Sequence, residues 1–66
     1  MFVWHYLDQT GGELGASDPF PDQDAAEGWM GEAWRDLRDR GVEEVVLVDE
    51  RRSQRVCRMG LSAELA

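Results

Sequence analysis

The order of apolar and polar residues along the chain predicts four strands. Four segments bounded by turn residues are predicted to be strands: 2–7, 13–17, 42–48 and 55–61. The first and third are rich in β-branched or aromatic residues, and the second is a short segment with Leu14 and Ala16 on one side. The glycine pair Gly11 and Gly12 is suited to closing a hairpin between the first two segments, and the polar run 49–53 is suited to closing one between the last two. Two hairpins are therefore expected.

One segment between the hairpins has helical periodicity. Six apolar residues recur at spacings of three and four, which places them on one helical face: Ala26, Trp29, Met30, Ala33, Trp34 and Leu37. Asp22 follows two prolines and is the expected N-cap, and Gly41 is a residue type that commonly ends helices. The helix is predicted to run from about residue 23 to 40.

This order of elements predicts an α+β fold, a two-layer ββαββ domain with one helix packed on a four-stranded antiparallel sheet. With 66 residues, the chain has room for a single domain, expected over residues 1–61, and residues 62–66 are predicted to form a disordered tail. No segment approaches the roughly 18 apolar residues of a membrane span, and no signal peptide is recognisable. We expect a cytoplasmic location and no membrane partner.

Both faces of the predicted sheet are apolar, although a single helix can cover only one. Alternation sorts the apolar residues of the first and third strands into four same-face pairs: Trp4 and Tyr6, Val3 and Leu7, Val45 and Leu47, Val46 and Val48. An exposed apolar face larger than about a few hundred Å² usually marks an interaction site. Unless the strands twist enough for both sets to reach the core, a partner is predicted to cover the second face.

A second copy of the chain is the predicted partner. So short a chain buries little surface, and its single cysteine, Cys57, excludes an intrachain disulfide, so oligomerisation is the remaining supplement to the core. Burying about 400 Å² more would contribute on the order of 10 kcal/mol before association costs. The predicted interaction surface is Trp4, Tyr6, Val46 and Val48. If the helix covers that face, the surface is Val3, Leu7, Val45 and Leu47. A two-fold dimer through strand edges, or contact with a different protein, are the alternatives.

The charge of the chain is acidic and unevenly distributed. A net charge of −7 argues against binding to nucleic acid or to an anionic membrane. Residues 1–34 hold seven acidic residues and no Lys or Arg, whereas all seven arginines lie between Arg35 and Arg58. The alternative function is an acidic inhibitor or adaptor that binds a basic protein through residues 8–32, in a complex that salt would weaken.

No group of residues indicates an enzyme. His5 could titrate near neutral pH, but a lone histidine on a strand is more often a packing residue. Cys57 adjoins Arg58, but strand neighbours point to opposite faces, so a buried and unreactive thiol is expected. A catalytic pocket around either residue would need a subunit interface. We predict no enzymatic activity and no cofactor.

Two charged clusters have structural explanations. Asp22, Asp24 and Glu27 lack the spacing of a calcium loop and suit the start of a helix, so no metal site is predicted. The second cluster consists of four arginines: Arg51, Arg52, Arg55 and Arg58. Four acidic residues are expected opposite them across the second hairpin: Glu43, Glu44, Asp49 and Glu50. Because these charges cancel, nucleic acid is not a predicted partner.

A motif-level likeness extends over nearly the whole chain. After the first hairpin, Phe20 and Asp22 lead into a helix bearing Ala26 and Trp29, and residues 41–49 have the pattern G-V-x-x-V-x-L-V-D. In this order the chain resembles short uncharacterised proteins of actinobacteria with a ββαββ layout. The resemblance implies the fold and a cytoplasmic location, and it carries no catalytic or binding residues.

Overall fold

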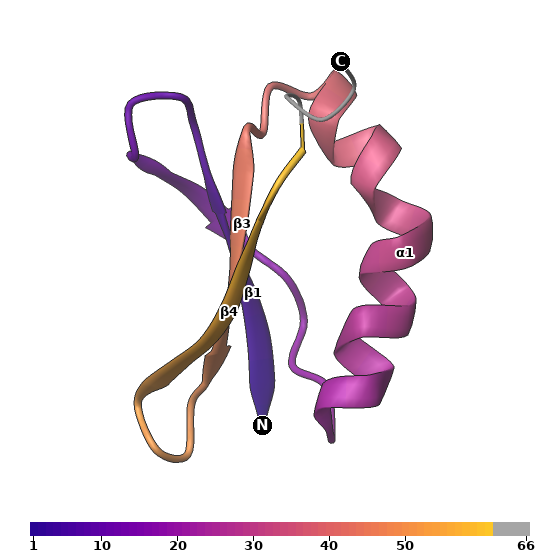
Figure 1. Ribbon diagram of the computed structural model, residues 1–66, viewed down its shortest axis with the longest axis vertical. Helices are drawn as coiled ribbons and strands as arrows, with labels where there is room; N and C mark the ends of the chain where they lie inside the picture. Colours follow the sequence, from indigo (N-terminus) through magenta and orange to yellow (C-terminus); the bar gives the residue numbers. More distant parts are fainter. Residues whose placement is uncertain (62–66) are drawn as a thin grey trace.

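The computed structural model describes residues 1–61 as one helix lying on one face of a four-stranded antiparallel sheet (Figure 1). The elements in chain order are β1 (Phe2–Leu7), β2 (Glu13–Ala16), α1 (Gln23–Asp39), β3 (Glu44–Asp49) and β4 (Gln54–Gly60). The predicted α+β class and the two-layer ββαββ layout are therefore confirmed. The predicted tail, residues 62–66, lies outside the described residues.

The two hairpins meet at the centre of the sheet, where β1 pairs with β3, so the strand order is β2-β1-β3-β4. The two hairpin turns lie at opposite ends of the sheet, and both bend away from α1 (Figure 1). In the first turn, the Asp8 carboxylate accepts hydrogen bonds from the Thr10 and Gly12 backbone N–H groups, both at 2.8 Å. These bonds, together with one from the Thr10 hydroxyl, which has the largest effect, lower the pKa of Asp8.

Capping interactions position both ends of α1. The Asp22 carboxylate accepts a hydrogen bond of 2.8 Å from the Ala25 N–H, as predicted for an N-cap. At the other end, Gly41 has a φ of +98°, and the Val42 N–H donates to the Leu37 carbonyl at 3.1 Å. This is the Schellman pattern of helix termination. Val42 therefore belongs to the helix end, and β3 begins two residues later than predicted.

The core lies between α1 and the two central strands. Its buried residues are Trp4, Ala26, Met30, Leu37, Val42, Val45, Leu47 and Leu61. Trp4 is 2% exposed, and its indole N–H donates to the Ala26 carbonyl at 2.9 Å, which ties β1 to α1. Phe20 and Trp29 close one end, with ring centroids 5.5 Å apart. Trp4 therefore joins β1 to α1 both by packing and by a hydrogen bond.

The helix leaves β4 uncovered. All seven residues of β4 are exposed, and the core cluster contains none of them. Cys57 lies opposite Leu47 and Met59 opposite Val45, so both side chains are on the helix side of the sheet without being covered by the helix. The expectation that Cys57 is buried is wrong for this reason.

Candidate interaction surface

The antiparallel register decides which apolar residues share a face of the sheet. Trp4 lies opposite Leu47 and Tyr6 opposite Val45. Trp4, Leu47 and Val45 are buried in the core, and Tyr6 packs against it, so this side faces α1. We call the opposite side of the sheet the open face. The apolar residues of the open face are Val3, Leu7, Val46 and Val48, and His5 lies among them.

The register corrects the predicted interaction surface. Of the set Trp4, Tyr6, Val46 and Val48, the first two lie on the helix side and the last two on the open face. The inverted set, Val3, Leu7, Val45 and Leu47, divides between the faces in the same way. Alternation determines which residues of one strand share a face. A one-residue shift in the pairing of two strands reverses which residues of the second strand share a face with those of the first. The prediction that each set shares one face is wrong, whereas the prediction that both faces are apolar is confirmed.

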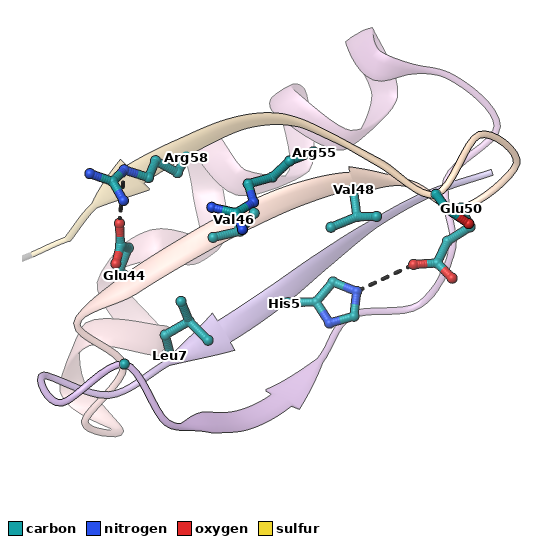
Figure 2. Close-up of a pocket in the computed structure, with 10 residues that line it drawn as sticks. His5, Leu7, Glu44, Val46, Val48, Glu50, Arg55 and Arg58 are labelled. Atoms are coloured by element: carbon teal, nitrogen blue, oxygen red, sulfur yellow. Dashed lines mark hydrogen bonds and ion pairs between the residues drawn. The ribbon is translucent and has the colours of Figure 1, made fainter.

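The open face forms a hollow of about 530 Å³ between the two hairpin turns, with Gly11 at one turn and Ser53 at the other among its lining residues. Figure 2 shows Val46 and Val48 in the middle of this face, with charged side chains around them. Val46 is 8% exposed, while Val48 and Leu7 are half-buried. The surface thus has an apolar centre and a charged rim.

His5 is held between two carboxylates from opposite sides of the open face. Its Nδ1 lies 3.0 Å from Glu13 Oε2, and its Nε2 lies 3.3 Å from Glu50 Oε2. A protonated imidazole donates to both carboxylates at once, whereas a neutral ring can donate to only one. The hydrogen bond to Glu13 raises the pKa of His5 most; Glu50 adds to this effect, and partial burial opposes it.

Arginines form the rim of the open face along β4. Arg58 Nε lies 3.3 Å from Glu44 Oε2, which confirms the predicted pairing across the hairpin for these two residues. Glu50 bonds to His5 instead of to an arginine. Arg55 has no ion pair within residues 1–61 (Figure 2). The open face is therefore acidic at the β2 edge, where Glu13 lies, and basic at the β4 edge.

The sequence did not indicate the partners of His5. Glu50 is 45 positions away along the chain, and only the pairing of β1 with β3 brings it near the imidazole. Glu13 lies opposite Leu7 at a bulge in β2, so its reach to His5 depends on an irregular register. Alternation along β1 places His5 on the same face as Val3 and Leu7, and the register shows that this is the open face.

The remaining candidate chemistry is weak. Partial burial raises the pKa of the Cys57 thiol and the Glu27 carboxylate adds to the shift, so the reactive thiolate is disfavoured. Within residues 1–61, no group of three or more His, Cys, Asp or Glu side chains is arranged to hold a metal ion. No helix in the described part of the chain is long and apolar enough to cross a membrane.

Comparisons of the chain with protein-family models, with curated proteins and with solved structures found no match in any of the three. The resemblance to short actinobacterial proteins therefore stays a prediction.

Proposed function

We propose that the protein is a non-enzymatic, cytoplasmic interaction module that self-associates through the open face of its sheet. The observation that carries the proposal is that Val46 and Val48 lie on the side that α1 does not cover, together with the apolar residues of β1. A domain with one helix on one sheet normally has polar residues at such positions. An apolar centre with a charged rim is the usual anatomy of a protein interface.

The distribution of charge favours one arrangement of two copies. A two-fold axis parallel to the strands would place the β4 edge of one copy over the β2 edge of the other. Arg55 and Arg58 would then face the acidic side, which carries Glu13. An axis perpendicular to the strands would instead place arginines over arginines. Electrostatic complementarity supports the first arrangement, an isologous dimer with the two sheets packed face to face.

Light scattering over a dilution series, at low and high salt, tests this proposal. We expect a dimer that persists at high salt, because the centre of the contact is apolar. Val48→Glu should give monomers, and Val48→Thr, a milder change of similar shape, should weaken the dimer without unfolding the chain. Leu14→Glu is the matched control, because Leu14 is 53% exposed and does not line the hollow of the open face. A wild-type monomer at high concentration would refute self-association.

A second candidate function is the acidic adaptor that binds a basic protein through residues 8–32. Asp18, Asp24 and Glu32 support it, because they are exposed acidic side chains in a region without Lys or Arg. Other acidic residues of this region are engaged within the chain, such as Asp22 at the helix start and Glu13 on His5. A monomer whose complex with a basic partner dissociates as salt is raised would favour this function over self-association.

A further inference from the structure

A groove runs between α1 and β4 on the helix side of the sheet, away from the open face. It consists of two adjoining hollows of about 260 and 330 Å³, which share Gly31 and Met59 as lining residues. We call it the α1–β4 groove. Met30 lines the first hollow and Trp34 the second. Glu27 and Arg58 are the charged residues that line the first hollow, and the walls are otherwise mostly apolar. The groove exists because α1 does not extend over β4.

The composition of the groove walls leaves space for incoming side chains. Gly31 has no atom within 4 Å of the position that a Cβ would occupy. Across the groove, Met59 is 39% exposed, although it lies on the same side of the sheet as the buried Val45. A flexible methionine at the edge of a core is suited to contact with varied apolar side chains.

The groove adjoins an unpaired strand edge. β4 is the last strand of the sheet order, and in the described part of the chain it pairs only with β3. Its outer edge therefore presents backbone donors and acceptors to solvent, a surface that can receive another strand. An extended segment that pairs with this edge would point alternate side chains into the α1–β4 groove and the others toward the open-face side.

The positive charge of β4 indicates which side chains of an added strand would suit the open-face side. Residues 51–61 contain four arginines and no acidic residue, in a chain whose net charge is −7. Arg55 lies opposite Val48 and Arg58 opposite Val46, so both are on the open-face side of β4. Acidic side chains directly across from them would be favoured, and basic ones disfavoured. If β4 of a second copy paired with this edge, its arginines would lie against Arg55 and Arg58 and repel them. This edge therefore does not suit pairing between two copies of the chain.

We propose that the β4 edge and the α1–β4 groove bind an extended segment of a different protein, in which apolar residues alternate with Asp or Glu, as a fifth strand. The apolar side chains fill the groove beside Met30 and Met59, and the acidic ones lie beside Arg55 and Arg58. This site is distinct from the open face. Because a guanidinium group has five N–H donors, Arg55 can bind a carboxylate from a fifth strand and one from a copy packed on the open face.

Fluorescence anisotropy with a labelled peptide of alternating valine and glutamate tests the proposal. We expect binding to the wild-type chain, and at least about tenfold weaker binding of the matched valine–lysine peptide. In an added strand, the N–H groups that face β4 belong to alternate residues. N-methylation of the valines or of the glutamates, in two separate peptides, should therefore abolish binding in one peptide and preserve it in the other. Equal effects of the two modifications would exclude strand addition.

Matched variants of the protein locate the site. Gly31→Leu should fill the groove and block binding, whereas Gly28→Leu is the control, because Gly28 is equally open but does not line the groove. Both changes replace a helical glycine with a better helix former, so neither should unfold the chain. Arg55→Glu should reverse the preference from the valine–glutamate to the valine–lysine peptide, and Arg40→Glu should not.

Two further outcomes, both seen with the Gly31→Leu variant, would overturn the proposal. One is unchanged peptide binding by the Gly31→Leu variant. The other is dissociation of a wild-type dimer by Gly31→Leu, which would show that a second copy occupies the groove. Neither outcome depends on Val48→Glu, so a failure of strand addition can be distinguished from a failure of the open-face dimer.

Discussion

His5 is the residue of the open face whose charge depends on pH near neutrality. Glu13 and Glu50 approach its two ring nitrogens at 3.0 and 3.3 Å, and both raise its pKa from the ordinary 6.5. The proton therefore binds more tightly in the folded chain than in the unfolded chain. Protonated His5 links Glu13 of β2 to Glu50 in the turn after β3, and these two parts of the sheet share no backbone pairing.

We expect the folded chain to lose stability as pH rises through the folded-state pKa of His5. A raised pKa contributes stability that is complete below the unfolded value of 6.5 and is lost above the folded value. Urea unfolding between about pH 6 and 8 measures this slope. His5→Gln should flatten the slope, and Glu32→Gln should leave it unchanged. Parallel pH profiles for the wild type and His5→Gln would contradict the role given to this cluster.

Trp4 stabilises the core, and its substitution should act on folding rather than on association. Its ring is 2% exposed, and its indole N–H donates to the Ala26 carbonyl at 2.9 Å. Trp4→Ala should destabilise the chain by about 3–5 kcal/mol, enough to unfold many small domains. Trp4→Phe should cost about 1–3 kcal/mol, because the indole hydrogen bond to the Ala26 carbonyl is lost and the smaller ring leaves part of the site unfilled. Denaturant titration measures both, with the exposed Leu14→Ala as a near-neutral control. A stable Trp4→Ala monomer would contradict the core assignment.

The elements themselves follow closely from local chemistry. A β-branched and aromatic run became β1, and Asp22 after two prolines became the N-cap of α1. The main departure is at Val42, which the apolar pattern assigns to the third strand but which belongs to the end of α1. Gly41 and Val42 complete the Schellman motif, which requires backbone hydrogen bonds that hydrophobic patterning does not reveal.

Two glycines of the helical region should respond to alanine in opposite directions. Gly28 is an exposed residue inside α1 with space around it, so Gly28→Ala should stabilise the chain by up to about 1 kcal/mol. Gly41 has a φ of +98°, which an L side chain rarely adopts, so Gly41→Ala should destabilise it by about 1 kcal/mol or more. Thermal unfolding of both variants provides the comparison. Equal shifts of the same sign would contradict the helix end described here.

The fold of the whole molecule was predictable from the sequence, but the composition of its surfaces was not. Alternation places Trp4 and Tyr6 together, and Val46 and Val48 together, yet it contains no information on which pair faces α1. That choice depends on the register between β1 and β3, and β2 and α1 lie between these two strands along the chain. The bulges in β2 and β4 add shifts of one residue that no local pattern specifies. Long-range pairing therefore determines the candidate site.

If the open face closes a dimer, the stability of the molecule depends on protein concentration. Association shifts the equilibrium toward the folded state. Each tenfold rise in protein concentration should therefore raise the free energy of unfolding by about 1.4 kcal/mol per dimer. The effect should be large here, because so short a chain buries a small share of its surface alone. Urea midpoints of the wild type should therefore rise with concentration, while those of Val48→Glu stay constant. Gly31→Leu should keep the wild-type dependence, because the α1–β4 groove lies outside this contact. A constant wild-type midpoint would instead identify the single chain as the folded unit.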